Sequence, residues 1–211
     1  ILCGAKVVED ILNVINAGSF HITRFKEDGE KIKMGEKILK GKAKISDFLL
    51  AERLSLNIIQ HLSGIATNTS AFVATLNDPK IKILDTRKTL PGLRKIQKYA
   101  VKCGGGQNHR FGLSDMIMIK DNHIKAAGSI ETAIEAVLRN KPKIKVEVEC
   151  ENLTQVEKAV KYKVDVIMLD NMSIEDIKRA SAIIRQNSNI AIEVSGGVSK
   201  KNIASYSGLD I

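Results

Sequence analysis

The feature that most constrains the fold is an alternation of short β-branched runs with amphipathic helical segments in the second half of the chain. After Asn77-Asp78-Pro79, we expect strands at 81–84, 116–120, 144–149, 164–169 and 190–194. Parallel strands need crossover connections, and these are normally helices. The pattern therefore predicts a parallel α/β sheet, and it is equally compatible with an open sheet and a closed barrel.

The first part of the chain has a different pattern. A helix is expected over Ala5–Ile15, a strand over Phe20–Phe25, a turn at Asp28-Gly29, and further strands near Ile32 and Ile38. We expect residues 1–76 to form a small α/β portion with linking helices, and residues 77–211 to form the parallel domain.

A long helical pattern joins the two portions. Between Ser46 and Leu76, apolar residues recur at three- and four-residue steps, with Ser46 available as a cap, and Gly64 is expected to divide the segment into two helices. The chain starts at Ile1 without an initiator Met and stops at 208–211, where a further strand is expected to begin. Both domains are therefore expected to be truncated.

Composition and cysteine content indicate the cellular compartment in which the protein is expected. The chain has 211 residues, 44% of them hydrophobic, and its apolar runs are too short and too interrupted by charge to span a bilayer. Cys3, Cys103 and Cys150 are odd in number and lack a CxxC pair, which favours a reducing compartment over a disulfide scaffold or a structural zinc site. We expect a cytoplasmic protein.

Charge limits the partners. Lys and Arg number 33 against 24 Asp and Glu, a net charge of +9, so anionic partners are expected. These are either nucleic acids or phosphorylated or carboxylated small molecules. Aromatic residues make up only 4%, and Lys is spread along the chain, so the small-molecule interpretation is favoured.

Polar residues cluster where the expected strands end, which is where parallel sheets carry their sites. They are Asp85-Thr86-Arg87-Lys88, Lys120-Asp121-Asn122-His123, Glu149, Asp170-Asn171 and Ser195-Gly196-Gly197. Glu147 and Glu149 alternate with valines, so both carboxylates lie on one side of the sheet, which would suit a barrel interior.

The cationic residues near turns and strand ends can hold a multiply charged anion. They are Arg87, Lys88, His109, Arg110 and Lys120. Arg offers a planar fork for carboxylate or phosphate and Lys a compact charge. The alternative for each is ordinary surface solvation.

Two glycine-containing segments and two carboxylates are further candidates. Gly104-Gly105-Gly106 is either a plain loop or a close backbone approach, while Ser195-Gly196-Gly197, before a helix expected near Ser199, is a better phosphate candidate. Glu149 and Asp170 could bind sugar hydroxyls, stabilise positive charge, act as an acid–base pair, or form salt bridges.

The histidines point to no metal. We interpret His21 and His61 as structural, leave His123 open, and find no metal-ligand spacing and no Ser-His-Asp or Cys-His signature.

Long segments resemble the quinolinate phosphoribosyltransferase family. They are Glu52–Asn57, His61–Thr67, Asp85-Thr86-Arg87-Lys88-Thr89-Leu90-Pro91-Gly92-Leu93-Arg94, Gly104–Arg110 and Ile119–His123. The resemblance covers essentially the whole chain. It implies a small N-terminal α/β sandwich domain joined to an incomplete α/β (TIM-like) barrel.

The resemblance also implies the activity of a pentosyl (glycosyl) transferase. Quinolinate and 5-phosphoribosyl 1-diphosphate would give nicotinate mononucleotide, diphosphate and carbon dioxide in NAD biosynthesis, with Mg²⁺ accompanying the diphosphate and no dedicated protein site for it. Relatives associated with molybdenum transport keep the fold with another substrate, but the intact Arg87-Lys88-Thr89 and Asn108-His109-Arg110 motifs argue against that alternative.

The resemblance assigns site residues. Quinolinate would be bound by Thr86, Arg87, Lys88, His109, Arg110 and Lys120, with Arg53 reaching in from the second subunit of a homodimer, and assembly beyond the dimer is left open. Ribose and phosphate would be bound by Lys88, Glu149, Asp170, Ser195, Gly196 and Gly197, with Lys88, Glu149 and Asp170 catalytic. A second phosphate loop would be expected beyond Ile211. No nucleic-acid or membrane partner is implied.

Overall fold

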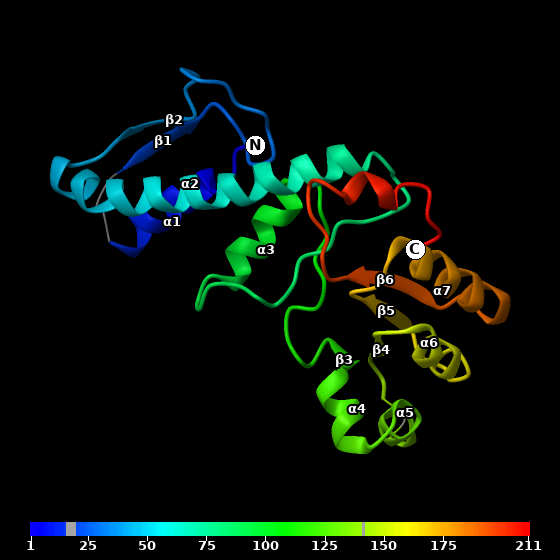
Figure 1. Cartoon of the computed structure of the whole chain (residues 1–211). Helices are drawn as coiled ribbons and strands as arrows, with labels where there is room; N and C mark the ends of the chain where they lie inside the picture. Colours follow the sequence, from blue (N-terminus) through cyan, green and yellow to red (C-terminus); the bar gives the residue numbers. More distant parts are fainter. Residues whose placement is uncertain (16–19, 141) are drawn as a thin grey trace. The chain divides into compact units, whose positions relative to one another are not determined.

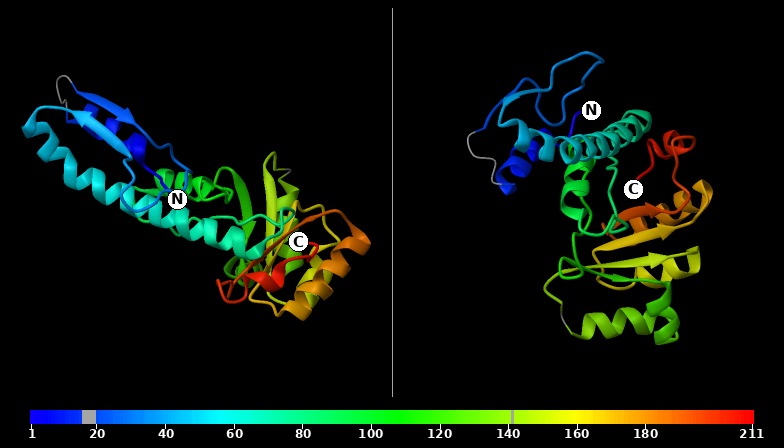
Figure 2. Two further views of the ribbon diagram at one scale, coloured as in Figure 1. Left: turned by 90° about the horizontal axis from the view of Figure 1, so that it is seen from above. Right: turned by 90° about the vertical axis from the view of Figure 1, so that its left-hand side faces the viewer.

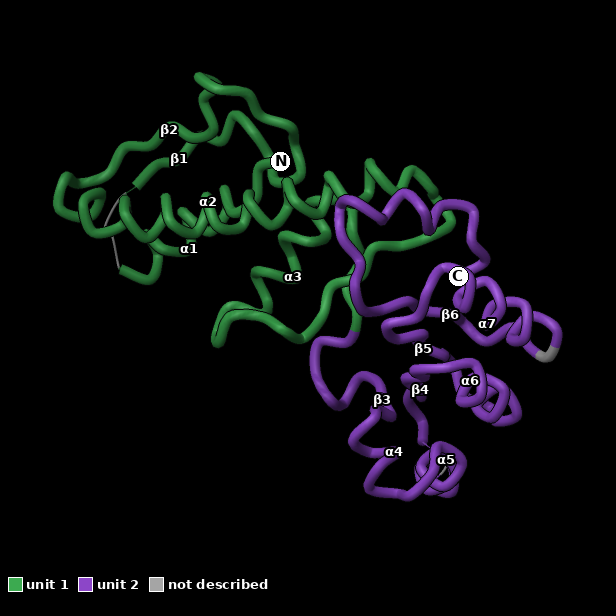
Figure 3. Tube along the Cα trace, in the orientation of Figure 1, with its two compact units in different colours: residues 1–109 green, residues 110–211 purple. Residues whose placement is uncertain are grey.

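The chain groups into two compact units, residues 1–109 and residues 110–211 (Figure 3). A computed structural model describes residues 1–15, 20–140 and 142–211. None of the helices in these ranges combines the length and the apolar character needed to cross a membrane.

The first unit is a helical layer with a small antiparallel sheet (Figures 1 and 2). Its elements are α1 (Ala5–Val14), β1 (His21–Arg24), β2 (Leu39–Lys42), α2 (Ile45–Leu76) and α3 (Arg94–Cys103). β1 and β2 pair antiparallel, with His21 opposite Lys42. Ile11 and Leu12 of α1 and Ala51 of α2 form the core beneath this sheet, with Ile22 packed against it.

The long helix differs from its prediction in two ways. α2 runs unbroken through Gly64, so the expected division there is wrong; an exposed glycine weakens a helix by only about 1 kcal/mol, which the rest of a 32-residue helix overrides. Ser46 is not the cap: the helix begins after Lys44, without a side-chain cap hydrogen bond. The strand expected near Ile32 is also absent, because 29–37 forms turns and irregular backbone.

The second unit is a parallel sheet with helical crossovers. Its elements are β3 (Met116–Ile119), α4 (Asp121–Ala127), α5 (Ile130–Arg139), β4 (Lys145–Cys150), α6 (Leu153–Ala159), β5 (Val166–Asp170), α7 (Ile174–Asn187), β6 (Ala191–Ser195) and the 3₁₀ helix η1 (Ile203–Tyr206). All pairings are parallel, in the order β3-β4-β5-β6. This unreversed order is that of a barrel wall, since a doubly wound sheet reverses its order.

Helices cover one face of this sheet. α5, α6 and α7 follow one another along it, with α6 packed against both neighbours (Figure 1). Val148, Ile167 and Leu169 from the strands and Ile134 and Ile177 from the helices are fully buried. The alternation of β-branched runs and helices therefore gives the parallel α/β sheet that it predicts.

Three local predictions are wrong. The segment 81–84 is not a strand, because only Leu84 pairs, in parallel with Gln107. No helix begins at Ser199: a turn leads into the four-residue η1. Residues 208–211 are irregular, and the Leu209 N–H closes a turn onto the Tyr206 carbonyl at 3.2 Å.

Candidate active site

The carboxyl ends of β3 to β6 carry the predicted polar residues of the second unit. Ile119 pairs with Val148, so Lys120 and Glu149 follow adjacent positions on β3 and β4. Asp170 pairs with Ser195 at the ends of β5 and β6. The parallel register thus brings these four residues to one edge of one sheet, as the sequence predicts.

Lys120 and Glu149 form an ion pair at this edge. The Lys120 Nζ lies 2.9 Å from Oε2 of Glu149, and the Glu149 side chain is only 12% exposed while that of Lys120 is 41% exposed. The backbone N–H of Lys120 donates to Nδ1 of His123 at 3.0 Å, so His123, left open by the sequence, serves to cap α4. A charged pair with one half-exposed partner can part to admit an anion.

The β5 and β6 ends form a close-packed turn region. The N–H of Asn171 donates to the Ser195 carbonyl at 2.9 Å, and Asn171 Nδ2 donates to Asp170 Oδ2 at 2.6 Å. Gly196 has φ +83°, and a Cβ there would lie 2.2 Å from Oδ1 of Asn171. Only glycine fits this position, so the backbone after β6 comes directly against the end of β5.

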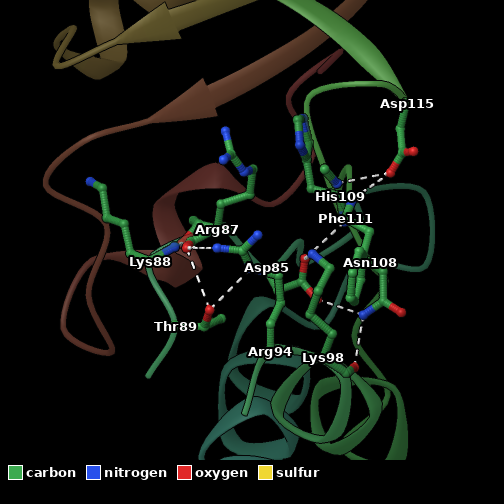
Figure 4. A network of polar contacts seen from close by, with 12 residues as sticks. Asp85, Arg87, Lys88, Thr89, Arg94, Lys98, Asn108, His109, Phe111 and Asp115 are labelled. Carbon is green, nitrogen blue, oxygen red and sulfur yellow. Dashed lines mark hydrogen bonds and ion pairs between the residues drawn. The ribbon is translucent and has the colours of Figure 1, made fainter. Parts of the chain in front are cut away.

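Arg110 is tied to β3. Its Nη1 donates to the Met116 carbonyl at 3.0 Å and its Nη2 lies 3.4 Å from Sδ of Met118. Asp115 closes the intervening loop by accepting from the N–H of Phe111 at 2.7 Å (Figure 4). These contacts fix the direction of the Arg110 guanidinium.

In the first unit, a buried carboxylate organises two predicted motifs (Figure 4). Asp85 forms an ion pair with Lys98 of α3, with both side chains less than a tenth exposed. Asp85 also accepts from Asn108 Nδ2 at 2.5 Å and from the backbone N–H of His109 at 2.9 Å. One carboxylate thus fixes the segment that precedes Arg87 and the segment that contains His109.

The loop after Asp85 is closed by its own hydrogen bonds. The carbonyl of Arg87 accepts from the N–H of Thr89 at 2.9 Å and from Nη2 of Arg94 at 3.3 Å. The N–H of Lys88 donates to Oγ1 of Thr86 at 3.0 Å. Lys88 is exposed, whereas Nε of Arg87 is buried and has no hydrogen-bond partner among the described residues. An unsatisfied guanidinium donor is suited to an incoming carboxylate or phosphate.

The glycine run beside this network is a close approach of backbones. A Cβ on Gly104 would lie 2.4 Å from the carbonyl oxygen of Ala66, and one on Gly106 would lie 2.8 Å from Cγ1 of Val101. This resolves the two readings left open for the run in favour of close packing, here against α2 and α3.

Arg53 is the one predicted site residue on α2. It lies on the exposed face of α2, and neighbouring side chains on the same helix are large, apolar and exposed. His61, expected to be structural, shares a 2.8 Å hydrogen bond with Gln97.

Sequence reasoning missed the supporting residues Gln97 and Lys98, and it gave Asn108 no role beyond its place in the motif with His109 and Arg110. Gln97 Oε1 accepts from the N–H of Leu90 at 3.0 Å and so ties the loop to α3. Lys98 is hidden in an amphipathic helix pattern, where a lysine normally marks the solvent face. In the sequence, Lys98 is marked only by its position four residues after Arg94, and this spacing does not indicate that a side chain is buried.

The second unit carries a lysine–glutamate pair at the carboxyl edge of a parallel α/β sheet, and the first unit carries Arg87 with a buried Nε that is unpartnered among the described residues. Parallel α/β domains with polar residues at this edge are the class to which many enzymes of small anionic substrates belong. The family model described as "Quinolinate phosphoribosyl transferase, N-terminal domain" matches residues 1–63 of this chain. The model described as "Quinolinate phosphoribosyl transferase, C-terminal domain" matches residues 65–211. The chain belongs to the quinolinate phosphoribosyltransferase family.

Individual relatives agree with this family. The chain is 39% identical to a Mycobacterium leprae protein named nicotinate-nucleotide pyrophosphorylase (carboxylating), with all of this chain and 75% of that protein covered. The crystal structure of NadC from Streptococcus pyogenes matches with a TM-score of 0.92 and 43% identity over 100% of this chain and 74% of that one. The Francisella tularensis nicotinate-nucleotide pyrophosphorylase matches at 0.89 and 42%, over 97% and 72%.

The family models, the compact units and the sequence pattern divide the chain at different places. The models meet at 63–65, the units at 109–110, and the sequence-based boundary at 76–77 lies between them. That boundary stays a prediction.

Proposed function

We propose that this chain transfers a phosphoribosyl group from 5-phosphoribosyl 1-diphosphate to the ring nitrogen of quinolinate, releasing diphosphate and carbon dioxide and forming nicotinate mononucleotide for NAD biosynthesis. The observation that carries this proposal is the family match over both domains. Relatives that are about 40% identical to this chain carry the name nicotinate-nucleotide pyrophosphorylase (carboxylating).

We assign quinolinate to the cationic residues. Arg87 supports this assignment through its buried and unpartnered Nε, and Lys120 through its partly exposed side chain. Arg110 and His109 are held by β3 and by Asp85 respectively, which favours recognition of a rigid dianion. Thr86 and Lys88 complete the set on the same loop.

We assign the sugar and phosphate to the carboxylate edge. Glu149 and Asp170 offer acceptors for ribose hydroxyls, and Ser195, Gly196 and Gly197 offer backbone N–H groups in a turn with two positive φ angles, +83° and +65°. Successive N–H groups in such a turn form a concave anion site. The 3₁₀ helix that follows is too short to add a helix dipole.

The chemistry follows from charge. Loss of diphosphate builds positive charge on the sugar, which the Glu149 and Asp170 carboxylates can stabilise while Lys88 neutralises the leaving group. The ring nitrogen then attacks the sugar carbon that lost diphosphate. The cationic ring accepts the electron pair left when the adjacent carboxylate departs as carbon dioxide, and a proton from water replaces that carboxylate on the ring carbon. A quinolinate carboxylate competes with Glu149 for Lys120, so substrate binding would release Glu149 toward the ribose.

Mg²⁺ fits as a companion of the diphosphate. The donors at this edge are carboxylate oxygens, the class that Mg²⁺ binds together with phosphate oxygens and water. When bound, Mg²⁺ would offset charge on the leaving diphosphate. We propose no dedicated protein site for it.

We further propose a cytoplasmic homodimer in which Arg53 of one subunit completes the site of the other. Support comes from the exposed apolar side chains near Arg53, since a monomer rarely leaves such a patch open to water. They are Ile45, Phe48, Leu49, Leu50 and Leu54. Assembly beyond the dimer stays open.

The test is an assay with quinolinate, 5-phosphoribosyl 1-diphosphate and Mg²⁺, with nicotinic acid as the control substrate. We expect equal amounts of mononucleotide and carbon dioxide from quinolinate and no product from nicotinic acid. If the protein turned over neither quinolinate nor nicotinic acid, its membership of the family would stand, and the result would favour a relative that acts on another substrate. Salt-dependent binding to generic DNA would instead support the nucleic-acid alternative raised by the net charge.

A further inference from the structure

Two thiols and a carboxylate meet in the first unit, and none of them belongs to the proposed active site. Sγ of Cys3, Sγ of Cys103 and a carboxylate oxygen of Asp28 all lie within 4.8 Å of one another. The hydroxyl of Tyr99 donates to Oδ2 of Asp28 at 3.0 Å. The sequence spacing of these residues gives no hint of this cluster.

Each member comes from a different segment that backbone hydrogen bonds hold in place. The N–H of Leu2 donates to the carbonyl of Glu30, and that of Gly29 to the carbonyl of Leu2, both at 2.8 Å. These two bonds lay Cys3 beside Asp28. The N–H of Cys3 also donates to Oγ of Ser63 at 2.9 Å.

The other two members are anchored as firmly. Asp28 Oδ1 accepts from the N–H of Ala5, at the start of α1, at 2.9 Å. Cys103 is the last residue of α3, one helical turn after Tyr99. Cys3 is fully buried and Cys103 partly buried against the same core cluster, so the cluster is preorganised and has one side toward solvent.

The members of the cluster interact with one another as acidic groups. Burial raises the pKa of the Cys3 thiol well above its usual range, and the neighbouring Cys103 and Asp28 raise it further. Burial and the same two neighbours also raise the pKa of Tyr99. The groups that act on one another here carry negative charge when ionised, and a bound divalent cation would reverse their effect.

We propose that Cys3, Cys103 and Asp28 bind one thiophilic divalent cation, of which Zn²⁺ is the natural representative. In a tetrahedral zinc site, sulfur lies about 2.3 Å and carboxylate oxygen about 2.0–2.2 Å from the metal, so ligand atoms are about 3.4–3.8 Å apart. Small side-chain rotations bring atoms within 4.8 Å to that spacing. The fourth position is left to water or to the Tyr99 oxygen.

The donor set also sets the selectivity. Two thiolates are soft ligands that favour Zn²⁺ and Cd²⁺ over Mg²⁺, so the ion bound here differs from the Mg²⁺ that accompanies diphosphate. Both thiols give up their protons to the solvent when the metal binds, so affinity falls as pH is lowered. A disulfide between the two cysteines is the competing outcome, and the titration below distinguishes it from metal binding.

Cadmium titration of the full, tag-free chain tests the proposal. The reduced protein is stripped with a chelator and titrated with Cd²⁺ in excess Mg²⁺, while the ultraviolet thiolate-to-metal absorption is followed, and bound Zn²⁺ is counted separately after equilibrium dialysis. We expect one ion per chain. Cys103→Ser, at a partly buried position, and Asp28→Asn should each weaken binding at least tenfold.

Cys150→Ser is the matched control, since this third cysteine is buried in β4 of the other unit and should leave binding unchanged. Thermal melting of each variant checks that it is folded. Absence of the absorption band, or an unchanged affinity in folded Cys103→Ser, would overturn the proposal. A second result would assign the two cysteines to a disulfide instead. In that case the protein fails to bind Cd²⁺, and dilute hydrogen peroxide, which is reduced to water, removes two titratable thiols.

Discussion

Asp85 shows how one buried charge can hold together segments that are far apart in the sequence. Its carboxylate accepts from Lys98, Asn108 and the His109 backbone, so two motifs far apart in sequence share one anchor. Removing one partner of a buried ion pair leaves an uncompensated charge, whereas removing both is much less harmful.

Lys98→Met should therefore destabilise the protein strongly. We expect a loss of about 3 kcal/mol or more in the free energy of unfolding, because the Asp85 carboxylate stays buried without its cation. Urea denaturation measures this loss. Lys95→Met, an exposed position on the same helix, is the matched control and should change stability by less than about 0.5 kcal/mol.

The double variant Asp85→Asn, Lys98→Met should recover part of that stability. If Lys98→Met and Lys95→Met had equal stabilities, the ion pair would not be an organising contact. Because Asp85 also fixes the backbone at His109, we expect reduced turnover in Lys98→Met even at temperatures where it is fully folded.

Glu149→Gln separates charge stabilisation from binding at the sheet edge. The amide keeps the shape but loses the charge, so turnover should fall on the order of a hundredfold, the size typical for loss of one transition-state electrostatic contact. Quinolinate binding, measured by calorimetry, should not weaken, because the amide competes less than the carboxylate for Lys120, and Asp170→Asn should also keep quinolinate binding. Glu151→Gln, two residues beyond and exposed, is the control. Loss of quinolinate binding in Glu149→Gln would move this residue to the quinolinate pocket.

At the scale of elements, we expect alanine substitutions at two glycines of the first unit to change stability in opposite directions. Gly64 is exposed inside α2 with nothing within 4 Å of an added Cβ, so Gly64→Ala should stabilise the chain by about 0.5–1 kcal/mol. Gly104→Ala would place its Cβ 2.4 Å from the Ala66 carbonyl and should destabilise. Thermal denaturation of both variants checks the pair. A stabilising Gly104→Ala would mean that the approach of Gly104 to α2 is loose.

The sequence predicted elements best where a whole strand is buried. Four of the five expected strands of the parallel domain are confirmed within one or two residues at either end, because β-branched runs between helices have few other solutions. The segment 81–84 failed because its pairing is limited to one bridge at Leu84, which propensity cannot foresee.

The residues of the candidate site also fall into those that the sequence predicts and those that it does not. Lys120 and Glu149 were predictable as neighbours, since parallel strands end at one edge and the register follows. Lys98 was not, because one buried lysine in a helix has the same local pattern as an exposed one. The cluster of Cys3, Asp28 and Cys103 depends on three segments meeting, which no single-segment pattern encodes.

At the scale of the whole molecule, we expect the exposed apolar residues of α2 to pack against a second copy of the chain. Ile45, Leu49 and Leu50 are 79%, 62% and 70% exposed, and at about 25 cal/mol per Å² their burial would favour association. We expect the protein to elute as a dimer in size-exclusion chromatography with light scattering. Leu50→Lys should shift it toward monomer, and Leu113→Lys, at another exposed leucine, should not.

Mixed dimers then decide whether Arg53 is shared. Arg53→Ala and Lys120→Ala should each be inactive alone. If Arg53 acts in the partner's site, a mixed dimer of the two variants contains one site with both wild-type residues, so mixing and reassociating them should restore about a quarter of wild-type activity: half the dimers are mixed, and one of the two sites in each is intact. If Arg53 serves its own subunit, both sites of every mixed dimer are defective and no activity returns. Recovery in the Arg53 pairing, with none when Glu149→Gln is mixed with Lys120→Ala from the same edge of the sheet, would show that the intact site draws its residues from two copies of the chain.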